Sequence, residues 1–399
     1  MRLEKISPKQ AEILKFICED YDTLICDGAV RSGKTVVMIA SFIIWAMSVF
    51  EKCNFAICAK TVTNAEKNVL KPLLEIEGLP YEMDYKRTER MLLVKCGRRE
   101  NRFYIYGGRD ESSYRLIQGI TLAGVFFDEV ALMPKSFADQ AISRTLTYDN
   151  AKLWFNCNPE SPAHWFYEEY IRELKPNTKR LHFLMEDNPI MTPEKIKTAQ
   201  SRFTGVFYDR YVRGLWVVAE GLVYKCFDEA AHVTDSVPEN GRYYISVDYG
   251  TLNPCSMGLW CVTNDTAFRV KEFYHDGRKT GSQLTDEEYY TELERLAGDK
   301  SIECVVIDPS AASFIATVKK HGRFSVKKAK NDVINGINCT ASFISGGRIK
   351  IHSSCRDILR EFKAYRYDEQ SQSDRVIKEN DHAMDDMRYF CYTILNRMW

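Results

Sequence analysis

The sequence has no excess of charge of either sign, because its 399 residues contain 55 Lys and Arg and 55 Asp and Glu. A protein that handles DNA is usually expected to be basic, so this balance counts mildly against that class. Local basic patches remain compatible with it. One candidate patch comprises Lys319, Lys320, His321, Arg323, Lys327, Lys328 and Lys330.

Paired cysteines and long apolar segments are also lacking. The 13 cysteines are scattered, with no C-x-x-C pair and no His cluster at zinc spacing, which indicates free thiols in a reducing compartment. The N-terminal segment has no apolar core of a signal peptide. The longest apolar run, residues 35–50, is shorter than the roughly 20 residues of a membrane span, so we expect a buried helix in a cytosolic protein.

The sequence contains no internal repeats, and its length predicts two domains. In the first half, short β-rich runs alternate with helical patterns, which predicts an α/β domain with a mostly parallel sheet. The predicted strands are 22–26, 54–60, 122–129 and 152–159, with a hairpin at 90–96 and 101–108 and helices at 34–50 and 63–77.

The character changes after residue 192. A helical pattern punctuated by glycines predicts a connector, and a second sheet begins at residue 242 with three consecutive strands followed by strands that helices separate. The predicted strands are 242–250, 255–262, 267–276, 303–310, 324–330 and 348–354, with helices at 285–297, 355–366 and 382–397.

One motif in the first half matches a phosphate-binding P-loop at every required position. G-A-V-R-S-G-K-T fits G-x-x-x-x-G-K-[ST] between a predicted strand and a predicted helix. The N–H groups of such a loop point at phosphate oxygens, the lysine reaches the β- and γ-phosphates, and the threonine ligates Mg²⁺. The predicted ATP-binding residues of the loop are Gly28, Arg31, Ser32, Gly33, Lys34 and Thr35.

Two adjacent acids follow a buried strand, as V-F-F-D-E at residues 125–129. Asp128 is expected to hold Mg²⁺ and its water. Glu129 is expected near the γ-phosphate, where it activates a water by general-base catalysis. A second acid at this position is typical of motor ATPases, so the pair predicts ATP hydrolysis coupled to movement.

Two further residues have alternative interpretations. Arg31, inside the loop, is either an arginine finger that reaches the γ-phosphate of its own chain or a solvated arginine. Gln10 is either a ligand of the adenine edge or a surface glutamine.

Acids in the second half end two of the predicted strands and recur on the last helix. Asp248 and Asp308 end strands that this topology can place side by side, whereas Asp385 and Asp386 lie on the helix with His382. Clustered carboxylates repel one another unless cations are held among them, and two Mg²⁺ or Mn²⁺ ions would clamp a phosphodiester. The pattern predicts a ribonuclease-H-like domain that hydrolyses nucleic acid with metal ions.

With both sites identified, the whole chain resembles the large terminase subunits of tailed bacteriophages, of the PBSX-like type. G-A-V-R-S-G-K-T and V-F-F-D-E match the family's Walker segments, and F-N-C-N-P-E-S-P-A-H-W at 155–165 resembles its coupling segment. I-S-V-D-Y-G, V-V-I-D-P-S and H-A-M-D-D-M-R-Y resemble its three acidic nuclease segments. The implied fold is α/β: a P-loop ASCE-type ATPase domain over 1–192, a connector over 193–235 and a ribonuclease-H-like nuclease domain over 236–399.

The resemblance also assigns roles. Asn156, Cys157 and Asn158 would sense the γ-phosphate. The metal ligands would be Asp248, Asp308 and Asp385, with His382 as a helper; Asp386 stands where a small residue is usual, so which of the two adjacent acids binds metal stays open. Arg144 is either an arginine finger towards a neighbouring subunit or a solvated residue of an amphipathic helix.

The implied activity is genome packaging. The protein would form a ring, expected to be a pentamer, on the portal protein of an empty capsid in the host cytoplasm, absent from the mature virion. A small terminase subunit would deliver double-stranded DNA, which ATP hydrolysis moves inward and the nuclease cuts. Two alternatives remain. A helicase-like or repair ATPase would share the P-loop and Glu129 but would cut nothing and would not depend on Asp248 or Asp308, and a nucleotide-dependent assembly factor would also cut nothing.

Overall fold

The computed structural model describes residues 5–201, 203–238, 240–251, 253–368 and 374–399. The chain divides into two compact units, of which the first holds the residues up to Gln200 together with Val206–Val218. The second holds Ser201–Gly205 and Ala219–Trp399. Each unit therefore contains part of the segment 193–235 that the sequence suggests as a connector.

The sheet of the first unit has the strand order β3-β4-β5-β2-β6-β7-β1-β8. Strand β4 pairs antiparallel with β3 and β5, whereas the other pairs are parallel. The strands are β1 (Thr23–Gly28), β2 (Asn54–Ala59), β3 (Glu82–Lys86), β4 (Met91–Cys96), β5 (Arg99–Gly107), β6 (Gly124–Phe127), β7 (Lys152–Asn156) and β8 (Thr178–Phe183). Strand β7 separates the P-loop strand β1 from β6, which confirms the predicted ASCE-type fold.

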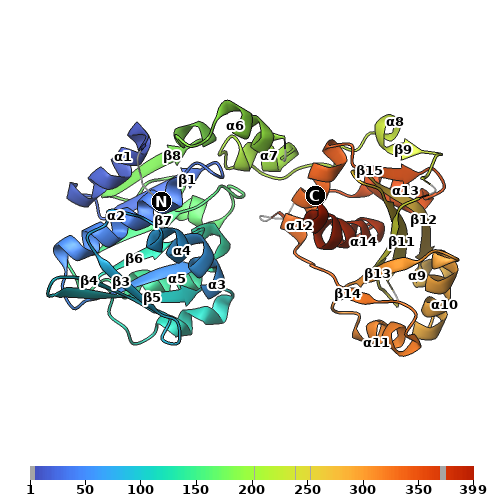
Figure 1. Ribbon diagram of the computed structural model, residues 1–399, viewed down its shortest axis with the longest axis horizontal. Coiled ribbons are helices and arrows are strands. Elements are labelled where there is room, and N and C mark those ends of the chain that lie inside the picture. The colour runs from blue at the N-terminus through green and yellow to red at the C-terminus, as the bar shows by residue number, and fades with distance from the viewer. Residues whose placement is uncertain (1–4, 202, 239, 252, 369–373) are drawn as a thin grey trace. The chain divides into compact units, whose positions relative to one another are not determined.

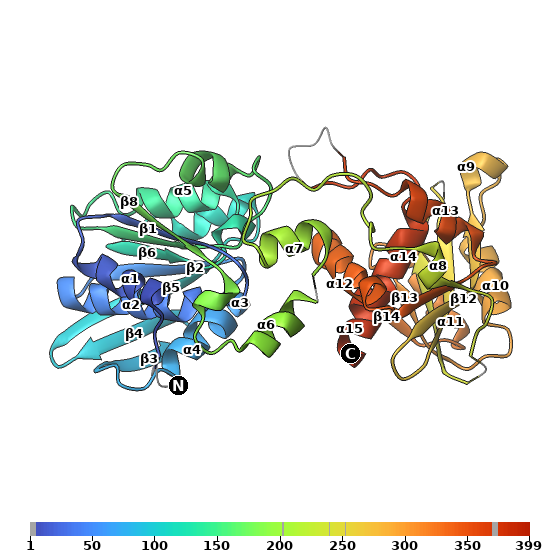
Figure 2. The same ribbon diagram turned by 90° about the horizontal axis from the view of Figure 1, so that it is seen from above.

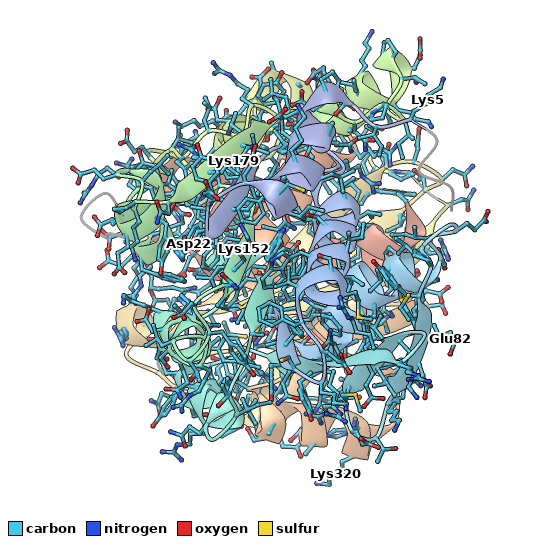
Figure 3. The ribbon with its side chains drawn as sticks, turned by 90° about the vertical axis from the view of Figure 1, so that its left-hand side faces the viewer. Lys5, Asp22, Glu82, Lys152, Lys179 and Lys320 are labelled. Atoms are coloured by element: carbon cyan, nitrogen blue, oxygen red, sulfur yellow. The ribbon has the colours of Figure 1, made fainter. Side chains whose placement is uncertain are left out.

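Both edge strands of this sheet, β3 and β8, are absent from the sequence prediction. They read EMDYK and TKRLHF, and most of their side chains are half-buried or exposed. Edge strands often carry charges that discourage pairing with other chains, so they lack an apolar signal. Figure 3 shows Lys179 on β8 beside the N-terminal helix, where its ammonium pairs with Glu19 at 2.8 Å and Glu12 at 3.0 Å.

Helix α2 confirms the predicted buried apolar helix. Its Phe42 and Trp45 pack on Trp154 of β7, with ring centroids 5.0 Å apart in both pairs. None of the helices in the described ranges is long and apolar enough to cross a bilayer. The helices of this part are α1 (Pro8–Lys15), α2 (Lys34–Val49), α3 (Val62–Ala65), α4 (Lys71–Leu74), α5 (Lys135–Ser143), α6 (Pro193–Gln200) and α7 (Gly205–Tyr211).

The sheet of the second unit has the order β14-β13-β10-β11-β12-β15-β9. Strands β10, β11 and β12 form the predicted antiparallel meander, and β13 lies parallel to β10. The strands are β9 (Val233–Thr234), β10 (Arg242–Asp248), β11 (Cys255–Val262), β12 (Ala267–His275), β13 (Ile302–Ile307), β14 (Val326–Lys328) and β15 (Ile349–His352). This arrangement confirms the predicted ribonuclease-H-like fold.

Helices cover both faces of this second sheet (Figures 1 and 2). Because side chains alternate along a strand, Ile245 and Val247 of β10 join the core under α10 and α11, while Tyr244 and Ser246 face α14. Asp248, next in the alternation, lies on the α14 side. The helices are α8 (Glu229–His232), α9 (Gly277–Thr280), α10 (Asp286–Ala297), α11 (Ala312–His321), α12 (Val333–Ser345), α13 (Arg356–Ala364), α14 (His382–Phe390) and α15 (Asn396–Met398).

Candidate functional site

The predicted P-loop connects β1 to α2 at the carboxyl edge of the parallel strands. Gly28 and Gly33 have φ angles of 128° and 78°, which side chains disfavour. A Cβ at Gly28 would lie 2.0 Å from the carbonyl oxygen of Phe183. The loop therefore requires glycine both for its backbone angle and for its close approach to β8.

Lys34 is buried at the centre of this loop. Its ammonium donates to the carbonyl of Ala29 at 2.8 Å, the hydroxyl of Ser32 at 3.1 Å and the side-chain oxygen of Asn158 at 3.2 Å. Burial lowers the pKa of Lys34. The amine is thus surrounded by neutral oxygens, a setting in which phosphate oxygens are strong competing acceptors.

Thr35, Asp128 and Asn156 meet beside the loop. The Asn156 amide donates to the Thr35 hydroxyl at 2.9 Å and to the Asp128 carboxylate at 2.7 Å. Burial, and then the charge of Glu129, raise the pKa of Asp128 to about 7. The buried Oδ1 of Asn156 has no hydrogen-bond partner within the described structure. A hydroxyl, a carboxylate and a free amide oxygen form a donor set that suits Mg²⁺ and its bound water.

Glu129 directly follows this cluster, with a left-handed φ of 54°. Burial raises its pKa, and the charge of Lys34 opposes that shift. A carboxylate of raised pKa beside a phosphate site has the character of a general base. Its catalytic role stays a prediction.

Arg31 and Gln10 differ in their contacts. The Arg31 side chain is exposed, while its carbonyl accepts a hydrogen bond from Asn188 Nδ2 at 2.7 Å. Gln10 is buried against the loop, and its amide donates to the carbonyl of Gly33 at 3.2 Å. Gln10 is therefore not a surface glutamine, although its contact with adenine stays a prediction.

Two predicted residues do not join this cluster. The Arg144 carbonyl accepts from the Leu122 N–H at 3.0 Å, ahead of β6 and thus at the opposite end of that strand from Asp128. Cys157 is buried in the sheet, where its N–H bonds to the Cys26 carbonyl at 3.2 Å and burial raises the pKa of its thiol. Of the coupling segment, Asn156 and Asn158 supply the side chains that reach the loop.

Asp27, the residue before the loop, is not among the residues predicted from the sequence. Its buried carboxylate accepts from Arg180 at 3.0 and 2.8 Å and from the Trp216 indole at 3.0 Å. Burial by itself raises the pKa of Asp27, but its interactions with His182 and Arg180 outweigh it and lower the pKa. Through this acid, β8 and the segment after α7 hold the base of the P-loop.

The second unit contains an open cavity of about 1060 Å³ where β10 ends. Asp248 and His382 line it together, with the His382 Nδ1 2.8 Å from an Asp248 oxygen. Burial raises the pKa of Asp248 to about 6. Burial lowers the pKa of His382, but the hydrogen bond and charge of Asp248 outweigh it and raise the pKa.

The adjacent acids of α14 have different surroundings. Asp385 lines the cavity and pairs with Arg388 at 3.0 Å and Lys378 at 3.3 Å. Asp386 is fully buried and accepts from Arg269 at 2.5 and 3.0 Å and from Ser246 at 2.7 Å. The geometry therefore favours Asp385 as the acid that is open to a ligand.

Asp308 follows β13, whose last residue pairs with Val247, so its backbone lies beside that of Asp248. Its carboxylate accepts from the Ser310 N–H at 2.7 Å. Burial raises the pKa of Asp308, but hydrogen bonding by Ser310 is the main cause that outweighs it and lowers the pKa. No three His, Cys, Asp or Glu side chains in the described part of the chain are arranged to hold a metal ion. The predicted ligands are neighbours in the fold, and each has a hydrogen-bond or ion-pair partner within the chain.

The predicted basic patch is partly neutralised. His321 and Lys320 lie 2.6 and 3.5 Å from Glu287, and Arg323 lies 3.2 Å from Glu294. Acids of α10 therefore offset these cations, which weakens the patch as a binding site for polyanions.

Known proteins resemble this chain over both units. The family described as "Terminase large subunit, T4likevirus-type, N-terminal" matches residues 25–231. The large terminase of a thermophilic bacteriophage is 44% identical in one crystal form, with a TM-score of 0.93, and the match covers 98% of this chain and 100% of that one. The complex of the same phage protein with ADP is 42% identical, with a TM-score of 0.90 and the same coverage.

A curated relative, the large terminase subunit of Escherichia phage T5, is 23% identical over 291 residues, which are 68% of this chain and 65% of that protein. The matched region thus spans slightly less than two thirds of the T5 subunit. Given the family match and the similarity to the thermophilic phage's protein along nearly its whole length, the chain belongs to the large terminase subunits of tailed bacteriophages.

Proposed function

We propose that this protein hydrolyses ATP to move double-stranded DNA into a procapsid and cuts concatemeric DNA by metal-dependent hydrolysis of phosphodiesters. The large terminase of the thermophilic phage has been crystallised with ADP and with ATP-γ-S, which supports nucleotide binding at the corresponding loop. The observation that carries the ATPase proposal is the junction of Thr35 and Asp128 through Asn156. One amide oxygen in that junction remains free for a metal-bound water.

In the ATPase step, the chain's own groups bind and orient the nucleotide. Lys34 would exchange its contacts with loop carbonyls for the β- and γ-phosphates, and Thr35 and Asp128 would hold Mg²⁺, which neutralises phosphate charge. Glu129 would take a proton from the attacking water. Asn156 and Asn158 would lose contacts when the γ-phosphate leaves, which couples hydrolysis to movement. Arg31 is the proposed finger in cis, and Arg144 the proposed finger in trans.

In the nuclease step, Asp248, Asp308 and Asp385 would hold two Mg²⁺ or Mn²⁺ ions, which supply charge stabilisation and activated water. His382, hydrogen-bonded to Asp248, orients that carboxylate. The proposal is supported by Asp248 and Asp385, which line one cavity, and by the pairing of β13, which precedes Asp308, with β10. Metal loading would require Asp308 to turn from Ser310, and Asp385 to exchange a cation partner.

The assembly belongs to the same proposal. The protein would act as a ring, proposed to be a pentamer, on the portal protein in the host cytoplasm, with DNA delivered by a small terminase subunit. Its two catalytic domains would be the ATPase domain of residues 1–192 and the nuclease domain of residues 236–399, joined by the connector of residues 193–235.

Plasmid cleavage in Mn²⁺ and in Mg²⁺, measured beside ATP turnover, tests both activities. We expect Asp308→Ala to lose cleavage and keep its ATPase, and Glu129→Gln to lose ATP turnover by about 100-fold or more while still cutting. The exposed acids Asp299→Ala and Glu82→Gln are matched controls. If the wild type hydrolyses ATP but cuts in neither metal, the alternative of a DNA-dependent ATPase without nuclease activity stands. Equal cleavage by wild type and Asp308→Ala would contradict the assigned site.

A further inference from the structure

Helix α14 carries the acids of the cavity, and its first turn is held by a side chain from another helix. The N–H groups of Ala383 and Met384 donate to one carboxylate oxygen of Glu361, at 2.7 and 3.3 Å. Glu361 lies on α13 and is fully buried. Asp381, the residue before α14, makes no capping bond with its side chain. Glu361 therefore serves the helix in the place of a local N-cap.

The same device recurs one element earlier. Glu272 of β12 accepts from the N–H groups of Asp357 and Ile358 at 2.7 and 3.3 Å, in the first turn of α13. A strand carboxylate thus fixes the start of α13, and a carboxylate of α13 fixes the start of α14.

The chain of contacts closes on the strand where it began. Arg269 of β12 pairs with Asp386 of α14 at 2.5 Å and with Glu272 at 3.4 Å. A Cβ at Gly258 would lie 2.2 Å from the Arg269 guanidinium, so glycine there makes room for the pair. We call Arg269, Glu272, Glu361 and Asp386 the polar circuit.

The polar circuit fixes the position of α14 relative to the sheet. It contacts the helix at its first turn and at its middle, while His382 and Asp385 line the cavity. The second oxygen of Glu361 accepts from the Tyr274 hydroxyl at 2.8 Å, and Tyr274 lines the same cavity. Burying ionic groups is costly, and apolar residues often stabilise a fold equally well. We therefore attribute to the polar circuit the fixed position of α14, which apolar packing would specify less strictly.

We propose that Glu361 is a positioning residue of the nuclease: through the first turn of α14 it sets where Asp385 and His382 stand against Asp248. The inference rests on the proposed nuclease function. In this view, the polar circuit places the proposed metal-binding acids. The spacing of residues along α14 does not by itself determine where these acids lie relative to the sheet.

Three variants of the full-length chain test the proposal. Glu361→Leu removes both acceptors, Glu361→Gln keeps one, and Leu296→Ala truncates the core on α10 as a stability control. Each is assayed, below its melting temperature, for Mn²⁺ affinity by calorimetry and for kcat and KM of plasmid cleavage.

For Glu361→Leu we expect about tenfold weaker Mn²⁺ binding and a kcat about 100-fold lower with KM little changed, as misplaced catalytic groups produce. Glu361→Gln should recover most of both, and Leu296→Ala should lower stability without changing either. Wild-type values for Glu361→Leu, or equal losses in Leu296→Ala, would overturn the proposal.

Two further outcomes separate this proposal from the proposed function. A wild type that binds Mn²⁺ but cuts nothing contradicts the nuclease, while the Mn²⁺ affinities of the variants still decide the positioning role. If Glu361→Leu does not fold, Glu361→Gln decides: it keeps one acceptor, so we expect a kcat about tenfold lower, at the low end of the range for changes that disturb supporting hydrogen bonds. Wild-type kcat and affinity in that variant would then overturn the proposal.

Discussion

The P-loop and the cavity satisfy their charged groups in opposite ways. In the P-loop, a buried cation, Lys34, is surrounded by carbonyl, hydroxyl and amide oxygens. In the cavity, acids are matched by basic side chains of the chain itself: Asp248 contacts His382, and Asp385 pairs with Arg388 and Lys378.

This difference indicates what each site exchanges on binding. A polyanion entering the P-loop competes with neutral acceptors, which a lysine gives up readily for charged oxygens. A divalent cation entering the cavity competes with ion pairs, so cations must leave before it binds. We therefore expect nucleotide binding to depend little on the chain's own ionic contacts, and metal binding to depend on them strongly.

The largest expected effect separates the two neighbouring acids of the cavity helix. Asp386→Asn removes the nearer charge partner of the buried Arg269, which keeps only Glu272 at 3.4 Å, so we expect the free energy of unfolding to fall by about 3–5 kcal/mol. Asp385→Asn also removes a charge partner, that of the buried Arg388. Arg388 keeps the carbonyls of Asn331 and Asp332 as acceptors at 3.1 and 3.3 Å, so we expect a smaller loss of stability for this variant, together with the loss of cleavage. Urea unfolding and plasmid cleavage of both variants measure the contrast. Equal stability of the two would show that the buried ion pair with Arg269 does not hold α14.

A pH series compares two buried carboxylates. The pKa of Asp27 is lowered in the folded state, so its contribution to stability is present above its unfolded pKa near 3.8 and is lost as pH falls through the lower folded value. Burial raises the pKa of Glu361 from 4.5 to about 7. The folded state then keeps a proton that the unfolded state has released, so stability falls as pH rises from 4.5 towards 7.

Melting temperatures of Asp27→Asn and Glu361→Gln between about pH 3 and 8 test these opposite slopes. The first variant should flatten the acid side of the profile, and the second the side between about pH 5 and 7. If the variants gave profiles parallel to that of the wild type, titratable groups other than Asp27 and Glu361 would control the pH dependence of stability on both sides.

The smallest effect concerns Lys378, whose side chain is largely exposed although it pairs with Asp381 at 3.2 Å and Asp385 at 3.3 Å. Exposed pairs are worth about 0–1 kcal/mol. Lys378→Met should therefore tighten Mn²⁺ binding by roughly two- to fivefold, by the conversion of that energy. Calorimetry checks it, with Lys363→Met as an exposed control that pairs with Glu229. Weaker binding would mean that Lys378 assists the metal.

Most residues of the predicted P-loop site can be identified from the sequence, because the motifs that mark them are short and contiguous. The loop from Gly28 to Thr35 and the acids Asp128 and Glu129 are contiguous motifs, each next to a buried apolar strand whose end they share. The adjacency of β10 and β13 also follows from the order of elements.

Partners that meet across the fold could not be predicted in this way. Glu361 and Arg269 occur in ordinary amphipathic and alternating patterns, and their contacts with α14 span 22 and 117 positions. Asp27 and Trp216 are 189 positions apart. The two edge strands, β3 and β8, are not predicted because their half-buried and charged residues have the composition of a loop. Asp386, a candidate ligand by position, is a buried ion-pair partner because the sheet beneath it supplies an arginine.

The segment after α6 has a practical consequence for dissecting the protein. The Val30 N–H donates to the backbone carbonyl of Tyr211 at 2.9 Å, and the Trp216 indole donates to Asp27. A Cβ on Gly214 would lie 3.1 Å from the Cα of Gly28. A fragment that stops at residue 192 would strip these supports from the base of the loop, whereas one that runs to residue 218 keeps them. Exchange of parts between related terminases would likewise have to transfer the P-loop and this distant segment as one module.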